Sequence, residues 1–204
     1  MYRDLLANEN STSQRFASIP MFTESENGGG MLKRQCTNEY KIAPIDRMIR
    51  SITKEPVKLW MGMTLDEIER MSRPKRLWKT HVYPFIGYWS GRDNWGSLND
   101  RERYVAERYK VKKLYEQFGM PVPENSLCFF CPFMADAQRA KMKKNQPILF
   151  EKACQLDEKL RDSTKCGIKE PAYIHKSKKP LRDVQFDEED DYQLFNCTSG
   201  NCDT

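Results

Sequence analysis

The distribution of apolar residues divides the chain into a weakly patterned beginning and a periodic remainder. Residues 1–30 are rich in Asn, Ser, Thr and Glu and end in three consecutive glycines. From Met31 onward, apolar residues recur at helical spacing, first at Ile45, Met48, Ile49 and Ile52. The pattern predicts a flexible N-terminal segment over residues 1–30 and an ordered body that begins near residue 31.

The ordered body is expected to be a helix-rich α/β domain with few, short strands. A strand is predicted over 57–63, and it leads into Thr64-Leu-Asp-Glu67, a capping box that begins a helix. Residues 87–100 look rich in turns. Further helices are predicted around 111–118 (ended by Gly119), over 134–144, and after Pro147 with Leu149, Ala153, Leu156 and Leu160 on one face.

Length and composition limit the class of protein. The chain has 204 residues, of which 39% are hydrophobic and 31% are charged, so one domain with a real core is expected. No apolar run approaches the length of a membrane span, and the first residues lack the apolar region of a signal peptide. We therefore expect a cytoplasmic protein without a membrane partner.

Charge is distributed unevenly along the chain. Residues 31–80 contain twelve Lys or Arg residues against six acidic ones, whereas residues 181–204 contain only Arg182 against seven acidic residues. The second stretch gives an acidic, Cys-containing tail over 183–204. A basic middle suits a phosphate-bearing ligand, although a charged face that only meets solvent is an equally acceptable interpretation.

The cysteines are the strongest chemical signal. Two of the seven lie three residues apart in Cys128-Phe-Phe-Cys131, a spacing that lets both thiolates face one metal or iron–sulfur centre. The candidates for further ligands are Cys36, which lies in a basic stretch, and Cys197 and Cys202. Cys154 is expected to be packed as a small apolar residue, and Cys166 to be a spare thiol. The alternative is a set of unrelated reduced cysteines. His81 and His175 have no partner at ligand spacing.

Five ordered motifs resemble the phosphoadenosine phosphosulfate reductase-like family, in its phage and bacterial branch, within the adenine-nucleotide alpha-hydrolase superfamily. They are Arg34-Gln-Cys-Thr-Asn-Glu-Tyr-Lys-Ile-Ala-Pro-Ile45, Leu59-Trp-Met-Gly-Met-Thr-Leu-Asp-Glu67, Tyr83-Pro-Phe-Ile86, Pro123-Glu-Asn-Ser-Leu-Cys-Phe-Phe-Cys-Pro-Phe133 and Ile174-His-Lys-Ser-Lys-Lys-Pro-Leu181. The resemblance covers residues 31–202. It implies a reductase-like domain over 31–182 and a partial adenine-nucleotide alpha-hydrolase-like fold with a Cys-containing C-terminal helical region.

The resemblance also implies a function in sulfur metabolism. The implied substrate is a sulfonucleotide or another adenylated compound, bound through Arg34, Lys41, Arg76 and Lys79. The implied cofactor is a [4Fe–4S] cluster or zinc, held by Cys36, Cys128, Cys131 and a fourth ligand from the tail, Cys202 before Cys197. The same two tail cysteines, Cys202 and Cys197, are the candidates for a mobile catalytic thiol.

The sequence departs from the family at two places. The Ser-Gly-Gly-x-Asp-Ser loop that binds nucleotide phosphates is absent, so the chain resembles the C-terminal part of the family's unit, and the tail lacks the family's Glu-Cys-Gly-x-His ending. Enzymatic activity is therefore an expectation that competes with two alternatives. One is a metal-stapled module that binds nucleic acid through residues such as Trp78, Tyr83, Trp89 and Trp95. The other is a subunit that needs a separate nucleotide-binding partner.

Overall fold

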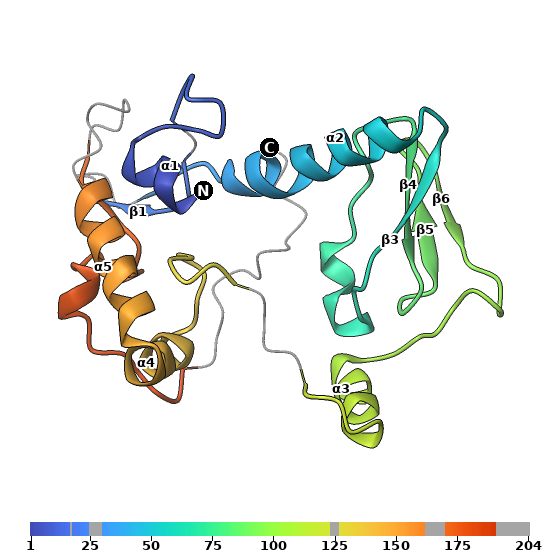
Figure 1. Cartoon of the computed structure of the whole chain (residues 1–204). Coiled ribbons are helices and arrows are strands. Elements are labelled where there is room, and N and C mark those ends of the chain that lie inside the picture. Colours follow the sequence, from blue (N-terminus) through green and yellow to red (C-terminus); the bar gives the residue numbers. More distant parts are fainter. Residues whose placement is uncertain (17, 25–29, 123–126, 162–169, 191–204) are drawn as a thin grey trace. The chain divides into compact units, whose positions relative to one another are not determined.

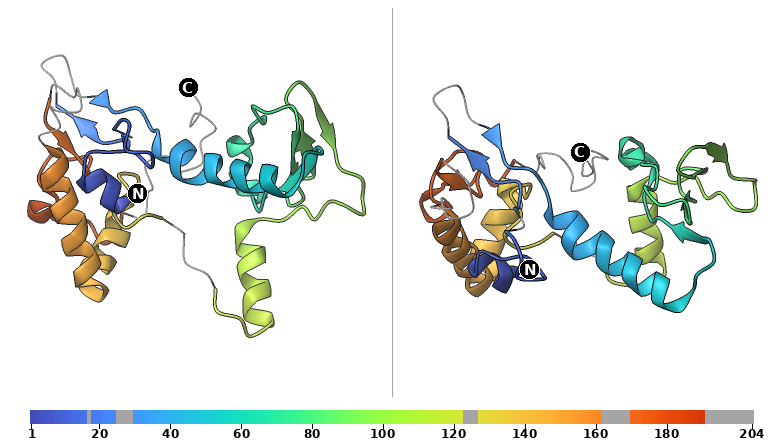
Figure 2. Two further views of the ribbon diagram at one scale, coloured as in Figure 1. Left: turned by 45° about the horizontal axis from the view of Figure 1, so that its top comes forward. Right: turned by 90° about the horizontal axis from the view of Figure 1, so that it is seen from above.

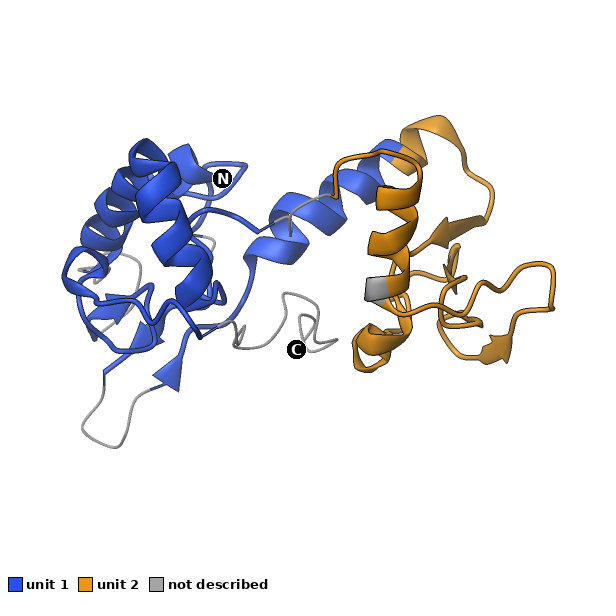
Figure 3. Cartoon of the chain, turned by 90° about the horizontal axis from the view of Figure 1, so that it is seen from below, with its two compact units in different colours: residues 1–48, 126–197, 202–204 blue, residues 49–125, 198–201 orange. Residues whose placement is uncertain are grey.

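The computed structural model describes residues 1–16, 18–24, 30–122, 127–161 and 170–190. The described chain is mixed α/β, with helices predominating over two small sheets (Figure 1). It divides into two compact units, coloured blue and orange in Figure 3. Among the described residues, unit 1 consists of 1–48 and 127–190, and unit 2 consists of 49–122.

Unit 1 joins the two ends of the described chain around one apolar core. In chain order its elements are α1 (Tyr2–Leu6), β1 (Phe22–Thr23), β2 (Gly30–Met31), the π-helix η1 (Asn38–Ile42), the first part of α2 (Ala43–Ile52), α4 (Asp136–Asn145), α5 (Pro147–Arg161), β7 (Ala172–Tyr173) and the short 3-10 helix η4 (Leu181–Asp183). The strands form an antiparallel sheet in the order β2-β1-β7. Helices α4 and α5 lie side by side (Figures 1 and 2).

The core of unit 1 lies on the inner face of α5. Ala153, Leu156 and Leu160 of this helix are buried, as the apolar spacing predicts. Cys154 is also buried, and burial raises the pKa of its thiol to about 11. The predicted packing of Cys154 as a small apolar residue is confirmed.

The N-terminal segment differs from the sequence expectation. Leu5, Ile19 and Met21 are fully buried in the same core as α5, and the Tyr2 hydroxyl donates a hydrogen bond of 3.2 Å to the carbonyl oxygen of Lys152. Leu5 lies in the short apolar run Leu5-Leu6, and Ile19 and Met21 lie in the run Ile19-Pro-Met-Phe22, and neither run is long enough to establish a period. Their burial is produced by tertiary contact with α5, which a local pattern does not reveal.

Unit 2 is built on a four-stranded sheet in the order β3-β4-β5-β6. Its elements are the end of α2, β3 (Val57–Trp60), the 3-10 helix η2 (Leu65–Arg70), β4 (Lys79–Tyr83), β5 (Tyr88–Ser90), β6 (Trp95–Ser97) and α3 (Arg108–Gln117). Strands β3 and β4 are parallel, and the remaining pairs are antiparallel. The expected turn-rich stretch 87–100 therefore contains two strands of three residues each.

The local signals of unit 2 are largely confirmed. The Thr64 capping box is present, and the Thr64 backbone N–H donates to the Glu67 carboxylate at 3.2 Å. Gly119 follows the last turn of α3 with a φ of +63°, the left-handed conformation expected of a residue that ends a helix. Helix α2 forms as predicted, but its apolar stripe is not buried, since Met48 is 63% and Ile52 73% exposed.

None of the helices in the described part of the chain combines the length and the apolar content that a membrane crossing needs.

Candidate functional site

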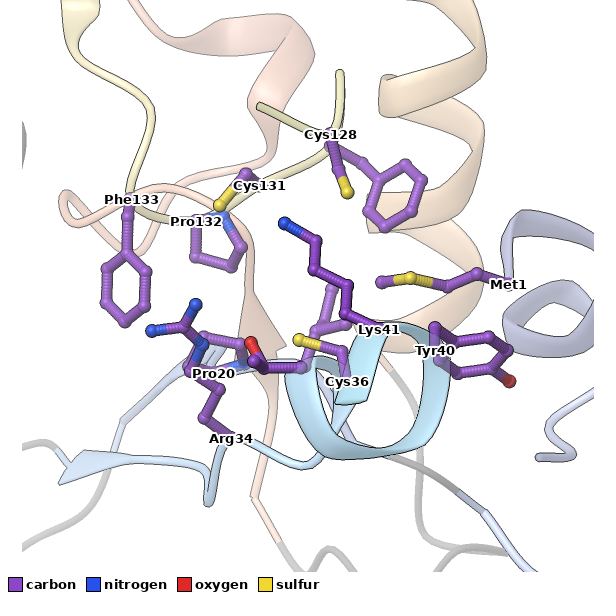
Figure 4. Close-up of a pocket in the computed structure, with 13 residues that line it drawn as sticks. Met1, Pro20, Arg34, Cys36, Tyr40, Lys41, Cys128, Cys131, Pro132 and Phe133 are labelled. Atoms are coloured by element: carbon purple, nitrogen blue, oxygen red, sulfur yellow. The ribbon is translucent and has the colours of Figure 1, made fainter. Parts of the chain in front are cut away.

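A pocket of about 350 Å³ in unit 1 brings together residues from two segments of the chain, 1–41 and 128–133 (Figure 4). It is lined by Met1, Ile19, Pro20, Arg34, Cys36, Thr37, Tyr40, Lys41, Cys128, Phe130, Cys131, Pro132 and Phe133. Five of these, Arg34, Cys36, Lys41, Cys128 and Cys131, are sequence-predicted site residues. We call this cavity the cysteine pocket.

The two later cysteines are held by a tight turn. The Cys131 backbone N–H donates to the carbonyl oxygen of Cys128 at 2.8 Å, which closes the turn over the two intervening phenylalanines. The rings of Phe129 and Phe130 meet edge to face, and both contact Tyr2 of α1. The aromatic pair thus anchors the turn in the core, and Figure 4 shows both sulfur atoms directed into the pocket.

Residues of the first family-like motif, 34–45, line the other side of the cysteine pocket. Cys36 lies where the chain enters the helical stretch that leads into η1, and Lys41 lies within η1. Figure 4 shows the Lys41 ammonium extending toward the Cys128–Cys131 turn, with the Cys36 sulfur below it. Arg34 reaches the same space, and its guanidinium lies over the Phe133 ring at 5.3 Å from the ring centroid. A π-helical turn is a common device at functional sites, and here it carries Lys41.

The pocket contains cysteines of the kind that bind zinc or an iron–sulfur cluster, but their side chains are not close enough together to form a metal site. Thiolates are the ligands that zinc and iron–sulfur clusters select, and three cysteines line this pocket. Within the described residues, however, no group of three or more His, Cys, Asp and Glu side chains could hold a metal ion. The predicted tail residues Cys197 and Cys202 lie outside the described residues.

The other predicted anion contacts lie elsewhere. Arg76 is exposed and Lys79 is buried in unit 2, where the Lys79 ammonium lies 5.4 Å from the centroid of the Trp78 ring. Neither residue lines the cysteine pocket. The basic stretch that suggested one continuous anion site is therefore divided between the two units.

Arg139 is a neighbour of the pocket that the sequence did not reveal. Its side chain is fully buried, and one guanidinium nitrogen donates to the Cys131 carbonyl oxygen at 2.7 Å. Its Nε and Nη1 have no hydrogen-bond partner within the described residues. Burial lowers the pKa of this guanidinium to about 10, while nearby acidic groups, first the Cys131 thiol and then Asp136, act in the opposite direction. The guanidinium thus stabilises the Cys128–Cys131 turn through its hydrogen bond to the Cys131 carbonyl oxygen.

A second buried polar pair lies at the start of α4. His175 Nε2 and Asp136 Oδ1 are 2.8 Å apart, and His175 Nδ1 accepts a hydrogen bond of 3.1 Å from the Ser177 backbone N–H. Because Nδ1 accepts, the proton of the neutral ring lies on Nε2, which donates to Asp136. His175 is therefore a structural link between α4 and the segment after β7.

This link predicts a dependence of stability on pH. Burial is the largest influence on the pKa of His175 and lowers it, although Asp136 opposes the shift. Below the ordinary histidine pKa of about 6.5, the unfolded chain then binds more protons than the folded chain, so stability falls as the pH falls. Urea unfolding of wild type and His175→Gln from pH 7.5 to 5 should show the stability difference between them shrinking with acidification. A difference that is constant over this range would contradict the assignment.

Comparisons with known proteins identify no relative: no family model, no curated protein and no solved structure matches the chain.

Proposed function

We propose that the chain is a phosphoadenosine phosphosulfate reductase-like protein that acts on a sulfonucleotide or another adenylated substrate in sulfur transfer or reduction. The observation that carries the proposal is the cysteine pocket, because two cations and three thiols predicted from separate motifs line one cavity of about 350 Å³. The finer fold proposed with it is a partial adenine-nucleotide alpha-hydrolase-like domain. A cytoplasmic location agrees with thiols that must stay reduced.

Arg34 and Lys41 are proposed to bind the anionic end of the substrate. A guanidinium offers paired N–H donors to phosphate or sulfate oxygens, and an ammonium adds a mobile point charge. The walls around them are apolar, with Ile19, Phe130 and Phe133 all buried. Attraction between opposite charges is stronger against such walls than in water, so each of the two cations would contribute more to anion binding here than at an open surface.

The three pocket cysteines are proposed to hold the metal centre. Cys36, Cys128 and Cys131 supply thiolates from two segments that lie far apart in the sequence, and Cys202 is the proposed fourth ligand. When bound, an iron–sulfur cluster or zinc would supply a charged, polarising centre beside the anion site. Cys197 and Cys202 also remain the proposed mobile thiols for sulfur transfer.

Binding of a defined sulfonucleotide tests the proposal directly. The Arg34→Ala variant should bind adenosine 5′-phosphosulfate more weakly by about 1.5–3 kcal/mol, since a charge-assisted hydrogen bond to the ligand is lost. Isothermal titration calorimetry on the full chain measures the difference. Lys33→Ala is the matched control, because Lys33 is an exposed neighbour that does not line the pocket.

Comparing adenosine with adenosine 5′-phosphosulfate tests whether Arg34 binds the anionic part of the ligand. Adenosine lacks the anion and should bind the wild type and Arg34→Ala with equal affinity. Equal binding of adenosine 5′-phosphosulfate by wild type and Arg34→Ala would remove Arg34 from the substrate site. Absence of binding to the wild type would contradict the proposed substrate class.

A further inference from the structure

One face of the unit 2 sheet carries aromatic and basic side chains at aligned positions. Trp60 of β3 is in register with Val82 of β4, Val82 with Trp89 of β5, and Trp89 with Gly96 of β6. Lys58 precedes Trp60 by two residues, so it belongs to the same face. We call this surface the Trp60–Trp89 face.

The opposite face of the sheet is covered in part by the segment of unit 2 around Ser72. The Ser72 carbonyl oxygen accepts hydrogen bonds from the Tyr83 hydroxyl at 2.9 Å and from the Ser90 hydroxyl at 3.1 Å. Trp95 projects on this side, with the Arg73 guanidinium 5.7 Å from its ring centroid. Trp95 is 39% exposed, whereas Trp60 is 58% exposed. Such an exposed indole on a sheet marks a surface for a ligand more than for the core.

The absence of a side chain at Gly96 lets the Trp89 indole pack against the backbone of β6. A Cβ atom at position 96 would lie 2.5 Å from two atoms of the Trp89 indole and 2.6 Å from a third. The ring therefore lies directly against the backbone of β6, in space that any larger residue would take. Trp89 packed in this way also lines the groove above the sheet.

The groove above these residues has a volume of about 390 Å³. It is lined by Lys58, Trp60, Thr80, Val82, Trp89, Ser97, Leu98, Asn99 and Glu102. Lys58 makes no ion pair within the described part of the chain and lies on the β3 side of the groove. Glu102 lies beyond β6, where its carboxylate accepts a hydrogen bond of 2.8 Å from the Asn99 side-chain amide.

We propose that the Trp60–Trp89 face binds a nucleobase together with its phosphate. The two indoles provide the apolar, planar surface on which a base stacks, and stacking of this kind tolerates any base. Lys58 supplies a cation for the phosphate, and the Glu102 carboxylate accepts a hydrogen bond from an exocyclic amino group of the base.

The dimensions and charge of unit 2 fit this ligand. Strands β3 and β6 are three strand spacings apart, which is roughly 14 Å at about 4.8 Å per step, so a nucleotide has room to lie across the strands. Residues 49–125 contain fifteen Lys or Arg residues against ten acidic ones, which favours an anionic ligand over a neutral sugar. This proposal is independent of the cysteine pocket.

Binding to the full chain should depend on the two indoles. The probes are a fluorescently labelled single-stranded oligodeoxynucleotide, followed by anisotropy, and adenosine 5′-monophosphate, followed by the indole N–H signals in NMR spectra. Trp60→Ala and Trp89→Ala should each weaken oligonucleotide binding about tenfold. Trp95→Ala is the matched control, because it removes an indole from the opposite face of the same sheet and should leave the affinity unchanged.

Two further variants test the details of the groove. Gly96→Ala removes no side chain but displaces the Trp89 ring, so it should weaken binding as Trp89→Ala does. Lys58→Ala should reduce the dependence of the binding constant on salt by about one phosphate contact. Arg34→Ala should leave the oligonucleotide affinity unchanged, since Arg34 belongs to the cysteine pocket in unit 1.

Comparing the two probes shows whether the bound base belongs to a mononucleotide or to a nucleic-acid strand. Signal changes at the Trp60 and Trp89 indoles with adenosine 5′-monophosphate support a mononucleotide site, whereas binding of the oligonucleotide alone supports a strand. Either result requires the loss with Trp60→Ala. Equal weakening by Trp95→Ala, binding of a neutral oligosaccharide with the same variant dependence, or no binding of either probe would overturn the proposal.

Discussion

Replacing Asp157 by Ala should destabilise unit 1 by about 3–5 kcal/mol, the range for removing one partner from a buried ionic network. Asp157 is 1% exposed and accepts hydrogen bonds from the backbone N–H groups of Ile174 at 2.8 Å and Leu181 at 2.9 Å. It also pairs with Arg161. Alanine would leave the two backbone donors without an acceptor and Arg161 without its ion-pair partner, and the segments after β7 would lose their attachment to α5.

Urea unfolding followed by far-UV circular dichroism measures this effect. Glu158→Ala is the matched control, because Glu158 is the next residue on α5 but lies at the surface, paired with Arg182. Its removal should leave the unfolding midpoint nearly unchanged. Asp157→Asn should fall between the two, since an amide oxygen still accepts from the backbone. A small effect of Asp157→Ala, similar to that of Glu158→Ala, would show that the buried carboxylate does not hold these segments.

Replacing Cys131 by Ser should remove nearly all bound metal from protein prepared without oxygen. A hydroxyl is a much poorer ligand than a thiolate for zinc or an iron–sulfur cluster, and the Cys128–Cys131 turn fixes this sulfur in the pocket. The same loss is expected for Cys128→Ser and for Cys36→Ser. Elemental analysis and the visible spectrum measure metal content and distinguish a cluster from zinc.

Cys154→Ser separates loss of a ligand from loss of any cysteine. Cys154 is buried on α5 and does not line the pocket, so its replacement should leave metal content unchanged. Full occupancy in Cys36→Ser would divide the proposed site and leave only the Cys128–Cys131 pair. Absence of metal from the wild type after reconstitution with iron and sulfide or with zinc would reject the metal centre but would not affect the Trp60–Trp89 face.

The helices were predictable where burial and local signals act together. Apolar spacing predicted α5, and α4 was predicted as a polar helix after Pro132. Gly119 and the Thr64–Glu67 capping box marked element ends that the structure shows. The burial of Leu5 and Met21 could not be predicted from sequence, because the apolar runs that contain them are too short to establish a period. Strands β5 and β6 contain three residues each, too few to establish an alternation.

The residues of the candidate site also divide into those that the sequence predicted and those that it did not. Arg34, Cys36, Lys41, Cys128 and Cys131 came from family-like motifs, and the structure places all five around one pocket. Arg139 had no such signal, and His175 lies in the fifth motif without a predicted role, because the burial of a charged or polar side chain depends on distant segments. Trp60 and Lys58 were more accessible to prediction, since alternation along β3 already assigns both to one face.

The described part of unit 2 lies, in the sequence, between the two parts of unit 1, and this order has a consequence for biosynthesis. Cys36 precedes Cys128 by 92 residues, and the described part of unit 2 lies between them. At about 5–20 residues per second, the ribosome adds the second wall of the pocket roughly 5–18 s after the first. The described residues of unit 2 are continuous in the sequence and are able to fold during this interval, while Cys36 and Arg34 still lack their partners. The pocket is therefore completed late in translation, and until then its first thiol is available to cellular oxidants and to competing metals.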